Sequence, residues 1–117
     1  MEYSQAHLLA RAIRESQEYR TYHSLKEIVM ADETQAALIR EYRKLQLSLQ
    51  MAAMSGQTPD SEDMQRFSGI NSLLFSKSEV RDFLLAEMQM QRTLADILKI
   101  ITEAADIDME IPGLGKA

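Results

Sequence analysis

The sequence predicts an all-α fold, an elongated bundle of about five helices in which the third and the fifth are long and antiparallel. The chain has 117 residues, which suits one domain, and 45% of them are apolar. Leu, Ile, Ala and Met dominate these apolar residues, a composition that favours helices over sheets. Only four Gly and two Pro are available for turns. We therefore expect few and long elements.

The helical pattern extends to about residue 106. Residues 1–106 are predicted to form a single helical domain. Residues 107–117 lose the helical period and gain Pro112 and two Gly. They are expected to form a short C-terminal tail.

The composition excludes several classes of function. The chain has no Cys, which rules out disulfides, thiol chemistry and cysteine-based metal or cluster sites. No apolar run approaches the roughly 20 residues of a membrane span, and the N-terminus has no signal-peptide pattern. The net charge of −5 argues against direct binding of nucleic-acid phosphates. We expect a cytoplasmic protein with no cofactor and no membrane insertion.

Two short helices are expected first, at about Tyr3–Glu15 and Glu18–Met30. In the first, Ala6, Leu9 and Ile13 form an apolar stripe at helical spacing. Ser16 is a suitable N-cap, so a break is expected over residues 16–19. One bent helix is the alternative.

The third helix is expected to open at Asp32 and to run to about Met54. Asp32 and Gln35 form a capping box, in which the carboxylate accepts a backbone amide and the Gln side chain reaches back. An apolar seam follows with spacings of four and three: Leu38, Tyr42, Leu45, Leu49 and Ala52. Gly56 suits the left-handed residue after a helix, and Thr58 is a suitable cap for a helix that starts with proline.

The fourth and fifth helices are expected at about Pro59–Leu74 and Lys77–Ala105. Ser76 and Glu79 read as a second capping box. The fifth helix carries the longest seam, in which spacings of three and four alternate: Val80, Phe83, Glu87, Met90, Leu94, Ile97, Ile101 and Ala104. This seam is the clearest pattern in the sequence.

The length of the fifth helix predicts a partner chain. About 29 residues at about 1.5 Å each give roughly 43 Å. A compact globule of this size has a radius of gyration of about 13 Å and a diameter near 35 Å. Either the bundle is elongated or part of the seam faces another chain. We expect contact with another chain, most simply with a second copy in a homodimer or higher oligomer. The interface candidates are Leu94, Ile97, Leu98, Ile101, Met51 and Met54.

Polar and methionine residues on the seams have two interpretations each. Asn71 and Glu87 either lie at a seam edge and reach water or make a buried polar contact that fixes the register between helices. Eight Met residues suggest an adaptable binding surface. Met64, Met88 and Met90 lie on the expected inner faces and are assigned to the core, whereas Met109 joins the interface candidates.

Few residues offer chemistry. His7 and His23 are the only side chains that ordinarily titrate near neutrality. His23 and Glu27 can offer two metal ligands, but no third ligand stands out. The carboxylates of Asp60, Glu62 and Asp63 suit the first turn of a helix, where negative charge is favourable. No catalytic or phosphate-binding motif is present, so we expect no enzyme.

The segment from His23 to Lys26 resembles the His-x-x-Lys-Gly stretch of histidine-containing phosphotransfer domains. That resemblance implies an imidazole that accepts a phosphoryl group and a Lys that helps to neutralise it. Glu27 stands where the family has Gly, and a carboxylate there would repel phosphate. A histidine phosphotransfer domain that uses His23 and Lys26 is the alternative function.

The order of elements resembles the YlbF/YmcA family of small helical bacterial proteins, with YheA-like relatives. The resemblance covers about residues 3–105. It rests on these residues: Ala6, Leu9, Ile13, Ser16-Gln17-Glu18-Tyr19, Asp32, Ile39, Tyr42, Gln46, Gly56, Leu74, Val80, Ala86-Glu87, Leu94 and Ile101.

This resemblance implies a non-enzymatic regulatory protein of the cytoplasm that acts in protein complexes. Such regulators are linked to competence, sporulation, biofilm formation and mRNA processing by RNase Y. Some members contribute cysteines to Fe–S clusters, a role that a chain without Cys cannot share. The implied partners are a second copy, other family members or an RNA-processing complex, and no catalytic residue is implied.

Overall fold

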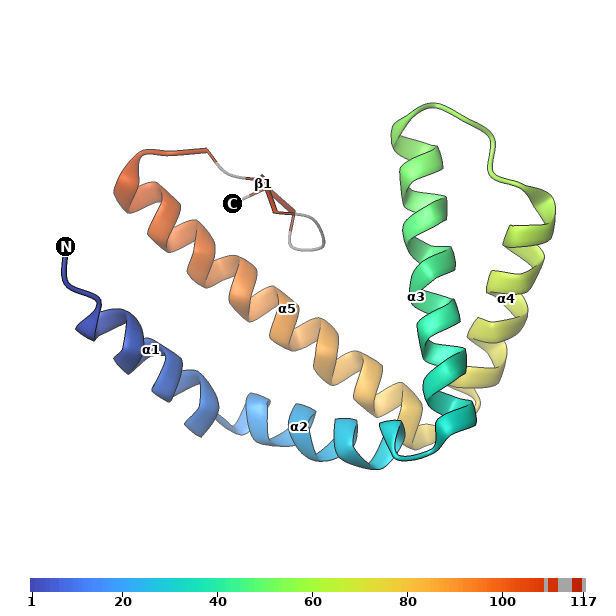
Figure 1. The fold of residues 1–117 in the computed structure, drawn as a ribbon, viewed down its shortest axis with the longest axis horizontal. Helices are drawn as coiled ribbons and strands as arrows, with labels where there is room; N and C mark the ends of the chain where they lie inside the picture. The colour runs from blue at the N-terminus through green and yellow to red at the C-terminus, as the bar shows by residue number, and fades with distance from the viewer. Residues whose placement is uncertain (109, 112–114, 117) are drawn as a thin grey trace. The chain divides into compact units, whose positions relative to one another are not determined.

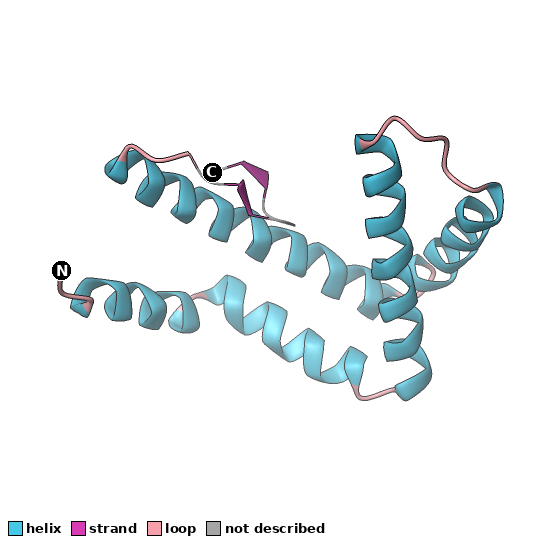
Figure 2. Ribbon diagram, turned by 45° about the horizontal axis from the view of Figure 1, so that its top comes forward, coloured by secondary structure: helices cyan, strands magenta, loops and turns pink. Residues whose placement is uncertain are grey.

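The computed structural model describes residues 1–108, 110–111 and 115–116 (Figure 1). It confirms the all-α fold, and this part of the chain contains five helices: α1 Ser4–Glu15, α2 Gln17–Met30, α3 Glu33–Met54, α4 Ser61–Phe75 and α5 Ser78–Ala105. As expected, α3 and α5 are the longest, with 22 and 28 residues. Figure 2 shows that most of the described residues lie in helices. The antiparallel pairing of α3 with α5 stays a prediction, as does the dimer.

Ser16 separates α1 from α2, as the sequence predicts. Its backbone is extended, with φ −72° and ψ 151°. The Ser16 hydroxyl donates to the Ile13 carbonyl at 2.6 Å and accepts from the Tyr19 amide at 3.2 Å. One side chain thus closes the last turn of α1 and caps the first turn of α2, because each helix end leaves backbone groups without helical partners.

The ends of α3 follow the expected capping rules with one correction. Asp32 Oδ1 accepts from the Gln35 amide at 3.1 Å. Gln35 does not reach back to the start of its own helix; its Nε2 donates to the Val29 carbonyl at 2.9 Å and ties the end of α2 to α3. Gly56 has φ +74°, and the Gln57 amide donates to the Ala52 carbonyl at 2.9 Å, as in a Schellman motif.

Two predicted caps are wrong. Thr58 does not cap α4; instead Asp60 Oδ1 accepts from the Glu62 amide at 2.8 Å, and the helix begins at Ser61. A carboxylate is the stronger N-cap acceptor, which explains why the start moves past Pro59. Ser76 does not open α5, because its hydroxyl donates to the Leu73 carbonyl at 2.7 Å and closes the end of α4.

The chain divides into two compact units, one formed by Leu25–Phe83 and one by Met1–Ser24 with Leu84–Ala117. In the first unit α3 and α4 pack side by side as an antiparallel hairpin (Figure 1). Its buried apolar residues are Val29, Ala36, Ile39, Leu45, Leu74, Val80 and Phe83. In the described part of the second unit the buried residues all lie on α5: Leu84, Ala86, Met90 and Thr102. The single domain predicted for residues 1–106 stays a prediction.

The end of α5 is a second Schellman motif, and its left-handed residue is Asp106, with φ 54°. The Ile107 amide donates to the Thr102 carbonyl at 3.1 Å. In the predicted tail, β1 (Glu110–Ile111) pairs antiparallel with β2 (Gly115–Lys116). Met109, an interface candidate, lies outside the described residues.

Candidate protein-interaction surfaces

The apolar seam of α5 changes its environment along its length. Phe83 and Ile101 are eighteen residues apart, about five full turns, so their side chains leave the helix in the same direction. Phe83 is 0% exposed and Met90 is 8% exposed, but Leu94 is 38% and Ile101 51% exposed. The seam is therefore covered in its first half and open in its second half. Ile97 and Leu98, between the two exposed residues, are half-buried.

The stripe of α1 belongs to the same unit and is also open. Leu9 and Leu8 are exposed, Ile13 is half-buried, and α1 contains no buried residue. An amphipathic helix in a folded domain normally buries its apolar stripe against another element. The second unit thus carries two apolar stripes, on α1 and on the end of α5, that remain partly exposed.

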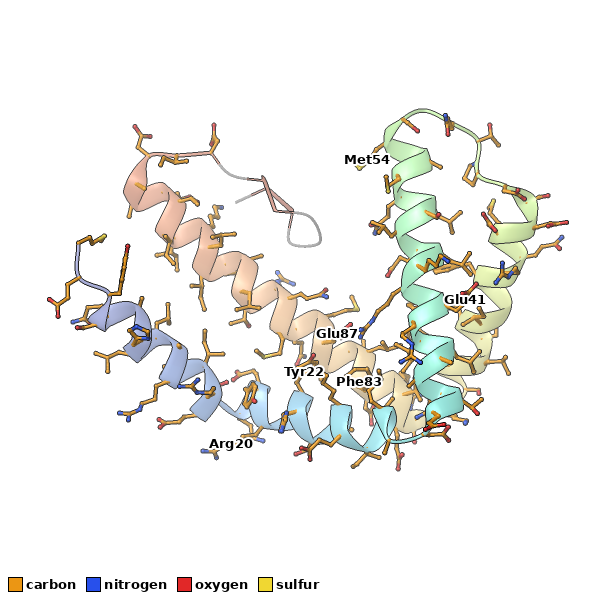
Figure 3. All side chains as sticks on the ribbon, viewed as in Figure 1. Arg20, Tyr22, Glu41, Met54, Phe83 and Glu87 are labelled. Atoms are coloured by element: carbon orange, nitrogen blue, oxygen red, sulfur yellow. The ribbon has the colours of Figure 1, made fainter. Side chains whose placement is uncertain are left out.

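Aromatic and ionic contacts fix which side of α3 faces α4. The rings of Tyr42 and Phe67 stack with centroids 5.0 Å apart, and Phe75 lies at 6.5 Å from Tyr42. Arg66 on α4 forms an ion pair with Glu41, which neighbours Tyr42. Figure 3 shows Glu41 and Met54 on opposite sides of α3.

The opposite side of α3 is apolar and open at its C-terminal end. Leu47, Met51 and Met54 follow one another at spacings of four and three, and they are 56%, 61% and 88% exposed. Four of the six interface candidates are exposed by a third or more, namely Leu94, Ile101, Met51 and Met54. Their role in an interface stays a prediction.

Methionine burial corrects part of the core assignment. Met90 is buried, as expected, but Met64 and Met88 are exposed. Met88 lies about 140° around α5 from Phe83, well away from the seam. Met64 lies in the first turn of α4, beside the end of the hairpin, where α3 has few residues left to cover it.

Asn71 and Glu87 are both half-buried, so each keeps part of its surface accessible. The buried polar residue in the described chain is instead Thr102, 3% exposed, which sequence reasoning missed. Its hydroxyl donates to the Lys99 carbonyl at 3.1 Å, so the side chain satisfies its polar atom within its own helix. Its place four residues after Leu98, one turn further along the same side of α5, was the available signal.

The side chains that could offer chemistry make contacts that stabilise helices. The exposed His23 imidazole stacks on Tyr19, with ring centroids 5.4 Å apart. Asp60 caps α4, and Glu62 and Asp63 lie in its first turn. In the described part of the chain no three His, Asp or Glu side chains gather as a metal site. Within the same residues no helix combines the length and apolarity that a bilayer crossing requires.

Comparison with known proteins identifies the family. The model of the family described as "Control of competence regulator ComK, YlbF/YmcA" matches residues 3–105. The chain belongs to the YlbF/YmcA family. This match covers the residues on which the resemblance rests.

The relatives of this YlbF/YmcA protein carry names without an assigned activity. A UPF0342 protein of Symbiobacterium thermophilum is 33% identical over 107 residues, which are 92% of this chain and 96% of the relative. A UPF0342 protein of Halothermothrix orenii is 33% identical over 105 residues, 90% and 89% of the two chains. A Bacillus stearothermophilus protein of unknown function (DUF964) has the same fold, with a TM-score of 0.68, 23% identity and coverage of 89% and 91%.

Family membership favours a regulatory protein among the functions that the sequence left open. The description of the family concerns regulation, and nothing in the matches points to catalysis. The phosphotransfer alternative at His23 and Lys26 gains no support from any of them. Glu27, in the place of the Gly of phosphotransfer domains, is the residue that already opposed it.

Proposed function

We propose that this chain is a regulatory adaptor without catalytic activity, which acts by binding protein chains and first of all a second copy of itself. The observation that carries the proposal is the uncovered half of the α5 seam. Leu94 and Ile101 continue the apolar stripe of Phe83 and Met90. Phe83 and Met90 are buried, whereas Leu94 and Ile101 remain accessible. A helix keeps such a stripe at a cost in solubility unless another chain covers it.

Covering the seam contributes favourably to association. Full burial of a Leu or Ile side chain contributes about 1.5–3 kcal/mol relative to exposure. Leu94 and Ile101 retain a third to a half of their exposure, so each has about 1 kcal/mol still to gain. Leu8 and Leu9 on α1 are further exposed apolar side chains of the same unit.

A second copy is the partner that this surface suits best. Two stripes of one unit, on α1 and on α5, are open at once. In a two-fold dimer, the α5 stripe of each copy can cover the α1 stripe of the other. One symmetric interface then buries both stripes of both copies. A partner with a single apolar face would leave one stripe open.

The family supports a regulatory role for the assembly. Its description names control of a competence regulator. We extend the proposal to the cytoplasmic roles that the YlbF/YmcA resemblance implies, in competence, sporulation, biofilm formation and RNase Y-dependent mRNA processing. The absence of Cys restricts this chain to a role without Fe–S ligation by its own residues.

Sedimentation velocity of the chain over the micromolar range tests the self-association. A dimer that dissociates on dilution, with a midpoint in or below this range, is the expected result. A monomer at every concentration would refute the self-association part of the proposal. The regulatory part is tested by affinity purification from the native cell with Ile101→Asp as the matched bait, since partners of the assembled form should be lost with that variant.

A further inference from the structure

A face of α3 that points away from α4 combines two cations with three apolar side chains. These residues, here called the basic–apolar face, are Arg40, Lys44, Leu47, Met51 and Met54. All five are exposed. At about 100° per residue they fall within an arc of about 80°, and they span about 21 Å of the helix. Tyr42, which stacks on Phe67 of α4, lies on the other side of α3.

We propose that the basic–apolar face binds an acidic amphipathic helix of a partner protein. Its apolar side chains would cover Leu47, Met51 and Met54, and its carboxylates would meet Arg40 and Lys44. This inference rests on the proposed function as an adaptor. It adds a second binding surface, whose partner is an acidic amphipathic helix. The α5 seam is left to self-association.

The apolar half of the face has the properties of a docking surface. Leu47, Met51 and Met54 are exposed on consecutive turns of one helix and form a continuous strip about 10 Å long. Methionine is unbranched and polarizable, so it adapts its shape to an incoming side chain. Amphipathic helices bind such strips through apolar residues at spacings of three and four.

The charged half determines the sign of the partner. α3 contains two acidic residues, Glu33 and Glu41. Glu41 is paired with Arg66 on the side that faces α4, and Glu33 lies in the first turn, about two turns before Arg40. Neither carboxylate lies between Arg40 and Met54 on the exposed face. A basic partner would place like charges together, whereas an acidic one forms charge-assisted contacts.

The order of residues along α3 adds specificity. Both cations precede the three apolar residues, so charge and apolarity occupy opposite ends of the face. The partner helix should therefore separate its acidic and apolar residues in the same way, over about four turns. An anionic membrane or RNA fits less well, because two cations and an apolar strip match one short acidic helix better than an extended polyanion that needs many Lys and Arg contacts.

The test uses two synthetic helical peptides of about four turns with a fluorescent label. One has Glu on the binding face of its first half and Leu on that of its second half, and the other has Lys in place of each Glu. Fluorescence anisotropy with the full chain should give micromolar binding of the Glu peptide, at least tenfold weaker binding of the Lys peptide, and weakening by NaCl. No binding, or no preference for Glu, overturns the proposal.

Variants locate the site. Arg40→Glu with Lys44→Glu should reverse the preference to the Lys peptide, and Leu47→Ser with Met51→Ser should weaken the Glu peptide at least fivefold. Arg92→Glu with Lys99→Glu is the matched control, because both residues are exposed on the side of α5 away from the seam and make the same charge change. Equal effects of the two charge variants would overturn the assignment. Circular dichroism checks folding, and Arg40→Gln with Lys44→Gln serves as the milder second variant, expected to abolish the preference without reversing it.

Further measurements test other ligands for this face and distinguish this inference from the proposed self-association. Vesicles with anionic phospholipid and a single-stranded RNA should not bind; binding of either that is lost with Arg40→Glu and Lys44→Glu would replace the protein partner. If Leu47→Ser with Met51→Ser dissociates the native dimer, the face is covered by a second copy and the inference fails. A dimer that does not bind the Glu peptide refutes this inference alone, whereas a monomer that binds it refutes self-association alone.

Discussion

Phe83 and Ile101 leave α5 on the same side, about five turns apart, yet Phe83 is fully buried and half of Ile101 is exposed. The two positions are equivalent in the geometry of the helix, so the difference in exposure arises from the segments that cover each end. Within the chain the first end is part of the core. The second end is available to another chain.

Truncation at the two positions should therefore give different kinds of loss. Phe83→Ala removes a buried ring and should cost about 3–5 kcal/mol of unfolding free energy at any protein concentration. Ile101→Ala should cost less than about 1 kcal/mol in dilute protein and more in concentrated protein, because the dimer adds its binding energy to stability. Urea denaturation at two concentrations a hundredfold apart measures both. Equal losses that do not depend on concentration would contradict the open seam.

A charge on the seam should dissociate the dimer without unfolding the chain. Ile101→Asp places a carboxylate in the proposed interface, where an unpaired charge is costly. We expect a folded monomer, judged by circular dichroism and sedimentation on one sample. The control is Ile100→Asp, because Ile100 is exposed on a side of α5 about 100° away from the seam. A dimer that tolerates Ile101→Asp as well as Ile100→Asp would show that the seam is not the interface.

The two Schellman motifs predict that glycine is favoured at both left-handed positions. Gly56 has φ +74° and open space around an added Cβ, so Gly56→Ala should cost about 1 kcal/mol through the left-handed backbone alone. Asp106 holds the same backbone region without the freedom of glycine. Asp106→Gly should stabilise by a few tenths to about 1 kcal/mol. Thermal melts of both variants decide, and a loss of stability in Asp106→Gly would mean that its carboxylate has a role of its own.

Ser16 should contribute more than an ordinary surface serine. Ser16→Ala removes both the bond to the Ile13 carbonyl and the bond from the Tyr19 amide, and should cost about 1 kcal/mol. Ser48→Ala, at an exposed interior position of α3, is the control and should be neutral or slightly stabilising because Ala has the higher helix propensity. The comparison is made by urea denaturation. If the two changes have the same effect, the double cap does not hold the α1–α2 junction.

Local chemistry explains which features could be predicted from the sequence. The caps at Ser16 and Asp32 and the left-handed Gly56 depend on residues within a few positions of one another, so spacing alone identifies them. The failures at Thr58 and Ser76 are competitions between neighbouring acceptors. Asp60, and not Thr58, caps the start of α4. Ser76 closes the end of α4 and does not cap α5.

The sequence by itself determined that the described part of this chain forms five helices, where their stripes run, and that no cysteine chemistry is possible. The tertiary structure alone decided which part of each stripe is covered. It buried Phe83 and left Ile101 open on one seam, turned Leu47, Met51 and Met54 away from α4, and buried Thr102. The physical reason is that helical periodicity depends on residues three and four apart, whereas burial depends on chain segments that are distant in sequence.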